Sequence, residues 1–137
     1  NPIKSLPDDV SDYPDAVARA LTQLRLVGVN GPYSVLLGAN EYTELIETRD
    51  HGYPLLEHVK RIIDGEIVWA PAIRGAFVLT TRGGDFELNI AQDVSIGYLS
   101  HTDTNVRLYL EEALTFRVLT SEASVALSAS PKHQVKK

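Results

Sequence analysis

The pattern of apolar and polar residues is clearest in the last third of the chain. Apolar residues occupy every second position between Val106 and Val118, apart from Glu112. A period of two is typical of a half-buried β-strand. At ~3.3 Å per residue, one strand from Val106 to Leu119 would be roughly 45 Å long. A compact domain of this size has a diameter of only about 35–40 Å. The strand therefore either breaks near Glu111-Glu112 or leaves the body to pair with something outside this chain.

The first half of the chain shows the helical period instead. Apolar residues recur at spacings of three and four and predict helices over residues 12–27, 41–47 and 54–64. Pro14 suits the first turn of the first helix, and Gly28 suits its end. Short apolar runs predict strands over residues 33–37, 67–70 and 76–81.

The remaining segments are predicted to be strands, turns and tails. Residues 82–85 (RGGD) read as a hairpin turn into a strand over 86–90, and a further strand is expected over 93–99. Residues 121–129 are expected to be a strand that pairs with the long one. Residues 1–11, with two prolines, read as a linker or extended arm. Helices thus dominate the first half and antiparallel strands the second, which predicts an α+β fold.

Composition places the chain among ordinary soluble globular domains. It has 137 residues, of which 44% are hydrophobic and 23% are charged. A net charge of −5 argues against a nucleic-acid partner, which favours a basic face. No apolar run is long enough to span a membrane, and no signal peptide opens the chain. The absence of cysteine excludes disulfides and thiol catalysis. Because the chain begins at Asn1 without a methionine, we expect it to be a fragment.

Candidate catalytic and metal-binding residues do not form a recognisable site. His51 and His58 lie near Asp50 and Glu57, but without the spacing that places two imidazoles on one ion, so solvated surface is the favoured interpretation. The carboxylates of Glu111 and Glu112 would point to opposite faces of a strand. The chain has no nucleophile elbow of the GxSxG type, and its RGGD turn precedes a strand rather than a helix. We therefore predict no catalytic residues, no metal site and no cofactor.

Five segments carry a resemblance to a known family. Residues 31–45, 50–73, 77–88, 92–98 and 106–118 resemble, in order and with matching spacing, the encapsulins, which are also known as linocin-type bacteriocins or culture-filtrate antigens. These are bacterial and archaeal shell proteins that resemble the major capsid proteins of tailed phages. The likeness covers nearly everything from Leu6 to Ala129.

The resemblance implies an organisation for the chain. Residues 12–90 would form the axial domain of the capsid-like fold, and residues 91–129 would be strands that return to the peripheral domain. The N-terminal half of the subunit would be missing, which would explain a long strand without neighbours. Residues 1–11 would be a linker or arm, and residues 130–137 a disordered basic tail.

The resemblance also implies a function without enzymatic activity. Encapsulin subunits self-assemble into an icosahedral cage in the bacterial cytoplasm, and are also found in culture filtrate. The cage encloses a cargo enzyme, commonly a peroxidase or a ferritin-like iron protein, which it captures through a C-terminal targeting peptide on the cargo. Asp50, His51, Gly52 and Tyr53 match the loop around the five-fold pore. The segment of Asp93, Val94 and Ile96 matches part of the cargo groove.

Two other functions stay open at this point. One is a secreted bacteriocin or peptidase activity, for which the sequence shows no nucleophile and base. The other is a small stand-alone ligand-binding domain, which would behave as a monomer on size exclusion. A shell fragment would instead expose an apolar strand and associate.

Overall fold

The computed structural model describes residues 2–130, and its contacts divide them into two units. The first unit contains residues up to Gly83 together with those from Ser121 onward, and the second runs from Gly84 to Thr120. The sequence analysis puts the boundary between residues 90 and 91 instead. Compared with that prediction, residues 84–90 belong to the second unit instead of the first, and residues 121–129 belong to the first unit instead of the second.

A five-stranded mixed sheet is the centre of the first unit, with strand order β1–β9–β6–β2–β5. Its strands are β1 (Ile3–Ser5), β9 (Ser124–Ser128), β6 (Ala76–Thr80), β2 (Tyr33–Leu37) and β5 (Ile67–Trp69). Strand β6 is antiparallel to both of its neighbours, whereas each edge strand pairs in parallel with the strand next to it.

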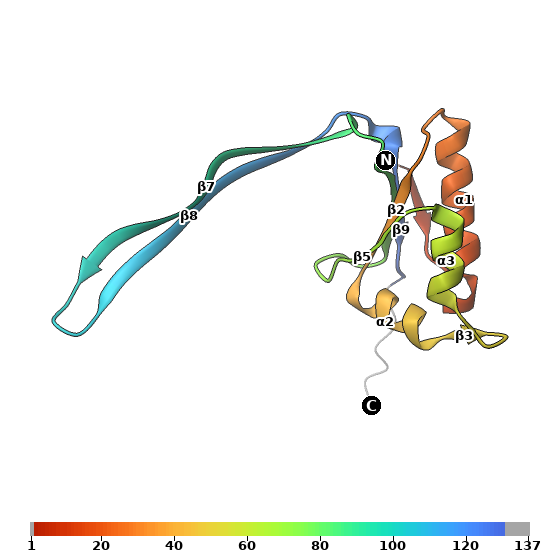
Figure 1. The fold of residues 1–137 in the computed structure, drawn as a ribbon, viewed down its shortest axis with the longest axis horizontal. Coiled ribbons are helices and arrows are strands. Elements are labelled where there is room, and N and C mark those ends of the chain that lie inside the picture. The colour runs from red at the N-terminus through yellow and green to blue at the C-terminus, as the bar shows by residue number, and fades with distance from the viewer. Residues whose placement is uncertain (1, 131–137) are drawn as a thin grey trace. The chain divides into compact units, whose positions relative to one another are not determined.

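Helices α1 and α3 lie side by side on one face of this sheet (Figure 1). The helices are α1 (Tyr13–Leu26), α2 (Ala39–Glu47) and α3 (Leu55–Ile63), with short 3₁₀ turns at Val10–Asp12 and Ser121–Ala123. All three predicted helices are confirmed, within two residues at each boundary. Leu24, Val35 and Ile63 are fully buried between helices and sheet, so the core lies on this face.

The second unit is a long antiparallel hairpin of β7 (Phe86–His101) and β8 (Val106–Val118). The long strand is real, and it does not break at Glu111-Glu112. Strand β7 has 16 residues against 13 in β8, and the pairing register shifts at three points. At each shift the extra residue belongs to β7, so the bulges bend the strand that was predicted as two pieces.

Three predictions about the connections are wrong. Residues 1–11 are no linker, because β1 pairs with β9 and Leu6 is buried in the core. Residues 121–129 do not pair with the long strand, since β9 lies between β1 and β6. The RGGD segment does not close a hairpin but connects the two units, as β6 and β7 belong to different sheets. The partners of β1, β6 and β9 are distant in sequence, so local pattern carried no information about them.

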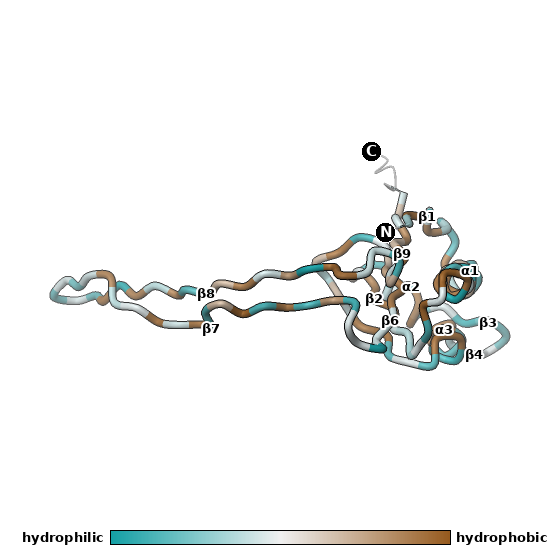
Figure 2. The backbone as a smooth tube through the Cα atoms, turned by 90° about the horizontal axis from the view of Figure 1, so that it is seen from above, coloured by the Kyte–Doolittle hydropathy of each residue, from teal (hydrophilic) through white to brown (hydrophobic). Residues whose placement is uncertain are grey.

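Three further observations complete the fold. No helix within residues 2–130 is long and apolar enough to cross a membrane. Residues 131–137, most of the predicted basic tail, lie outside the described part of the chain. Figure 2 shows apolar and polar residues following one another along β7 and β8.

Candidate functional site

The predicted pore loop forms a miniature hairpin between α2 and α3. Strands β3 (Arg49–Asp50) and β4 (Tyr53–Pro54) pair antiparallel, and His51-Gly52 make the turn. The φ angles of His51 and Gly52 are 49° and 82°. Positive φ at both central residues is the geometry of a type I′ turn, which matches the twist of the strands it joins. The loop is therefore a defined turn rather than an irregular connection.

Contacts within and behind the hairpin fix the side chains at its tip. His51 Nδ1 lies 2.6 Å from Asp50 Oδ1, and the imidazole is 95% exposed. The Tyr53 ring meets the edge of His58, with centroids 6.2 Å apart, and Arg61 lies 5.4 Å from its centroid. Aromatic and cation–π contacts of this kind favour one orientation of the tyrosine. A carboxylate, an imidazole and a phenol are thus presented together to solvent.

The structure brings together all four loop residues selected from the sequence, Asp50, His51, Gly52 and Tyr53. It also adds residues that the sequence analysis did not assign to the loop. His58 and Arg61 lie one turn apart on α3 and both contact Tyr53. Their i, i+3 spacing was visible in the sequence, but nothing local indicated that Tyr53 would fold back onto them.

The second predicted set, Asp93, Val94 and Ile96, lies on β7 in the other unit. Asp93 and Val94 fall inside the bulge between Gln92 and Ser95, where Asp93 Oδ1 accepts a hydrogen bond from the Val94 N–H at 2.7 Å. Val94 and Ile96 are 59% and 69% exposed. The bulge therefore takes Val94 out of the regular alternation of the strand, whereas Ile96 pairs in register with Leu110.

One face of the β7–β8 hairpin is apolar along most of its length. Cross-strand partners share a face, and the apolar pairs are Phe86–Val118, Leu88–Phe116, Ile90–Leu114, Ile96–Leu110 and Tyr98–Leu108. We call these ten residues the apolar ribbon face. The opposite face carries polar pairs such as Asn89–Thr115 and the ion pair Glu87–Arg117.

The apolar ribbon face is uncovered within the hairpin. Every residue of β8 is exposed, and Leu110 is 74% exposed. So large an exposed apolar patch marks an interaction surface in a native protein.

The chemistry of a metal centre is not assembled anywhere in residues 2–130. No group of three or more potential His, Cys, Asp or Glu ligands lies close enough together there to hold an ion. The His58 ring meets the Tyr53 ring, and His51 Nδ1 lies 2.6 Å from Asp50 Oδ1.

Comparison with known proteins gives close relatives along most of the chain. A family model described as encapsulating protein for peroxidase (Linocin_M18) matches residues 1–115. A type 1 encapsulin shell protein from Mycobacterium tuberculosis is 62% identical over 128 residues, covering 93% of this chain and 48% of the relative. One from Brevibacterium linens is 55% identical over 129 residues, covering 93% and 48%. The chain thus spans about half the length of the curated relatives it matches.

Solved structures share the fold at lower identity. A virus-like particle from Pyrococcus furiosus matches with a TM-score of 0.79 at 21% identity, over 93% of this chain and 56% of that one. A chain from Mycobacterium phage Che8 matches with a TM-score of 0.66 at 18% identity, over 91% and 52%. The predicted α+β, capsid-like fold class is confirmed by these matches.

Proposed function

Because this chain belongs to the family of encapsulating proteins whose model matches residues 1–115, we propose that it is part of a structural shell subunit of the encapsulin type. Copies of the complete subunit assemble into an icosahedral cage. The cage encloses a cargo protein that carries a targeting peptide, either a peroxidase or a ferritin-like iron protein. We assign this cage to the bacterial cytoplasm and assign no enzymatic activity to the chain itself.

The observation that carries the proposal is the uncovered apolar ribbon face. A two-stranded hairpin is at best marginally stable alone in water. The β7–β8 hairpin also exposes large side chains such as Leu110, Leu114 and Phe116. Both problems disappear when the face packs against other parts of a larger subunit or against neighbouring copies. A stand-alone enzyme or binding domain has no use for such a face.

Electron microscopy of the complete gene product tests the proposal directly. We expect closed shells of uniform diameter from the unmodified protein. Leu114→Asp puts a charge on the apolar ribbon face, and we expect it to abolish shells, because a buried unpaired carboxylate is costly. Thr115→Asp is the matched control, since Thr115 is the next residue on β8 and lies on the polar face. Unmodified protein that remains monomeric, or Leu114→Asp protein that still forms shells, would refute the proposal.

Within the shell, we propose that five copies of the β3–β4 hairpin ring an opening. The exposed Asp50 and His51 support this role, because five carboxylates and five imidazoles around one opening would select ions by charge. Asp50→Asn is expected to slow Fe²⁺ entry into assembled shells several-fold and to leave entry of a neutral dye unchanged. Unchanged iron entry in Asp50→Asn and His51→Ala shells would eliminate the ring as a filter. Glu112→Gln, on β8, is the control for loss of one carboxylate.

We further propose that Asp93, Val94 and Ile96 form one wall of the groove that receives the cargo peptide. The bulge that turns Val94 outward and the 69% exposure of Ile96 support this assignment. Val94→Ser is expected to weaken retention of the cargo in shells that otherwise form normally, because Val94 lies in the bulge and is not part of the apolar ribbon face. Shells that retain the full cargo load with Val94→Ser would remove this residue from the groove.

A further inference from the structure

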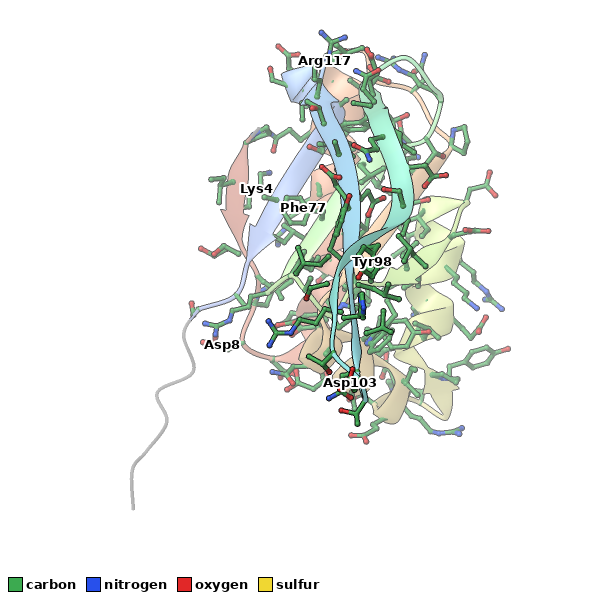
Figure 3. The ribbon with its side chains drawn as sticks, turned by 90° about the vertical axis from the view of Figure 1, so that its left-hand side faces the viewer. Lys4, Asp8, Phe77, Tyr98, Asp103 and Arg117 are labelled. Carbon is green, nitrogen blue, oxygen red and sulfur yellow. The ribbon has the colours of Figure 1, made fainter. Side chains whose placement is uncertain are left out.

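Two tyrosines of this chain lie against a histidine, and the two contacts differ in what they join. Tyr98, which is labelled in Figure 3, and His101 lie three residues apart on the same strand, β7, with ring centroids 6.0 Å apart. Tyr53 and His58 lie on different elements, because Tyr53 belongs to the β3–β4 hairpin and His58 to helix α3. A contact between two elements fixes their relative position, whereas a contact within one strand does not.

The β3–β4 hairpin has little internal support. Each strand has only two residues, and even longer two-stranded hairpins are marginally stable in water. At the turn, the His51 side chain is 95% exposed, and a Cβ atom on Gly52 would have no described atom within 4 Å. Within the hairpin, Arg49 Nη1 lies 3.5 Å from the Gly52 carbonyl oxygen, which is long for a hydrogen bond. The position of the hairpin therefore depends on contacts with the rest of the first unit.

Two contacts connect the hairpin to helix α3. At the base, the N–H of Leu55, the first residue of α3, donates a hydrogen bond to the carbonyl oxygen of Thr48 at 3.0 Å. Nearer the tip, the Tyr53 ring meets His58, and the Arg61 guanidinium lies 5.4 Å from the centroid of the same ring. The first contact fixes where the two strands begin, and the second fixes how β4 lies against the helix.

Tyr53 is also the cross-strand partner of Asp50. Partners in an antiparallel pair project their side chains on the same face of the ribbon, with Cβ atoms about 5 Å apart. A movement of Tyr53 away from α3 therefore carries the carboxylate of Asp50 with it.

We propose that Arg61 is a positioning residue for the β3–β4 hairpin. Its guanidinium holds the Tyr53 ring on α3, and through Tyr53 it sets the direction of the Asp50 carboxylate. This inference rests on the proposed role of the hairpin as an ion filter. Five carboxylates select cations only while they face the same opening, so releasing Tyr53 turns Asp50 away from the opening and slows the passage of a cation.

The charge of Arg61 gives this proposal a distinctive sign. A guanidinium that acted on ions through its charge alone would repel Fe²⁺, so its removal would speed iron entry. A guanidinium that holds Tyr53 has the opposite effect, because its removal lets Asp50 leave the opening and slows iron entry. The direction of the change in Arg61→Met shells therefore distinguishes positioning from simple repulsion.

Shells of the complete gene product allow two measurements. The first is hydrogen exchange of residues 49–55, measured by mass spectrometry, which reports how firmly the hairpin is held. We expect Arg61→Met to raise this exchange rate about two- to five-fold, which corresponds to the loss of one exposed cation–π contact. The second is Fe²⁺ entry, which we expect to be slower in Arg61→Met shells than in unmodified shells. Methionine preserves the helix, because its helix propensity is close to that of arginine.

Three further variants control for the loss of charge and for the route of the effect. Lys60→Met removes the neighbouring cation, whose Nζ lies 3.7 Å from Glu57 Oε1, and is expected to leave the exchange of residues 49–55 unchanged. Arg61→Lys keeps a cation without the planar guanidinium, and we expect its exchange and entry rates to lie between those of Arg61→Met and the unmodified protein. In shells that already carry Asp50→Asn, Arg61→Met is expected to cause no further slowing, because it acts through that carboxylate.

The outcomes separate the positioning role from the filter itself. Faster iron entry in Arg61→Met shells, or unchanged exchange of residues 49–55, would overturn the positioning role. Slowing that adds fully to the slowing by Asp50→Asn would also overturn it, because Arg61 would then act by another route. Normal iron entry in Asp50→Asn shells would instead refute the filter, and faster exchange in Arg61→Met would still show that Arg61 holds the hairpin. Faster exchange together with slower entry that requires Asp50 supports the positioning role.

Discussion

The two units of this chain contain similar fractions of apolar residues but arrange them differently. In the first unit the apolar residues converge, and Leu24, Val35 and Ile63 are completely buried. In the second they line one face of a ribbon in which every residue of β8 is exposed. The first unit has a buried core of its own, and the second unit has none. The fraction of apolar residues therefore does not show whether a segment folds around its own core or exposes an apolar face; the three-dimensional arrangement of these residues does.

The largest expected contrast comes from removing the same side chain in each unit. Leu24→Ala empties a fully buried site, and we expect a loss of about 2–5 kcal/mol in the free energy of unfolding. Leu110→Ala removes a leucine that is 74% exposed, and the expected change in this chain is within about 0.5 kcal/mol. Urea unfolding followed by circular dichroism measures both. Equal losses would mean that the hairpin has a core of its own.

One glycine in each unit shows how much room the surrounding structure leaves for an added Cβ atom. A Cβ on Gly65 would lie 1.7 Å from the backbone carbonyl oxygen of Tyr33, whereas one on Gly97 would lie 1.9 Å from the tip of the Tyr109 ring. The backbone of β2 cannot yield without disturbing the sheet, but an exposed tyrosine ring can swing away. Gly65→Ala is therefore expected to cost about 1–3 kcal/mol or more, and Gly97→Ala less.

A second substitution distinguishes these two causes. Tyr109→Ala should restore hydrogen-exchange protection in β7 and β8 of the Gly97→Ala variant, since it removes the clashing ring. Substituting the Tyr33 side chain should not rescue Gly65→Ala, because the clash is with a backbone atom. Rescue of Gly65→Ala by Tyr33→Ala would contradict this account.

The same contrast explains what the sequence could predict. The three helices follow from their 3.6-residue period, and the long strand β8 follows from an alternation that only Glu112 interrupts, since both patterns are local. The pairing of β9 with β1 joins residues more than a hundred positions apart, and β1 is only three residues long. No pattern of three residues identifies an edge strand. The first eleven residues were therefore mistaken for a linker.

The candidate sites were predictable to different degrees. Asp50, His51, Gly52 and Tyr53 were selected by the family resemblance, and because they are adjacent in sequence, any turn brings them together. The contact of Tyr53 with Arg61 depends on how β4 enters α3, which sequence spacing does not determine. The bulge at Asp93 and Val94 depends on a mismatch of register between two strands.

Alkaline pH provides a smaller effect that is confined to the first unit. Burial raises the pKa of Tyr13 above its usual range, and the nearby carboxylates of Glu44 and Glu41 raise it further. The folded protein therefore keeps the phenol protonated where the unfolded chain, with a pKa near ~10, has lost the proton. Stability is unaffected below that pH and falls above it by up to about 1.4 kcal/mol per pH unit.

Tyr13→Phe checks this assignment, because phenylalanine cannot titrate. The variant loses the hydrogen bond from the phenol to Glu44 Oε2, 3.4 Å long, and is expected to unfold with a shallower dependence on pH above 10. Urea midpoints at neutral and alkaline pH give the measurement. An identical alkaline slope in both proteins would assign the effect to other groups.

The smallest expected effect compares one exposed ion pair from each unit. On the polar face of the hairpin, Arg117 Nη2 lies 2.7 Å from Glu87 Oε2, and on α3 Lys60 Nζ lies 3.7 Å from Glu57 Oε1. Double-mutant cycles with glutamine replacements should give coupling energies of about 0.2–1 kcal/mol for the hairpin pair and about 0.3–0.5 kcal/mol for the helical pair.

Measuring the two coupling energies again at high salt shows whether the charges are exposed to solvent. At 1 M salt the screening length falls to ~3 Å, so both couplings should shrink toward zero. If the hairpin pair keeps its coupling at high salt, the Glu87–Arg117 face must be shielded from solvent. The polar face of the ribbon would then be covered as well as its apolar face, and the hairpin would lie between two layers of the assembled shell rather than on one.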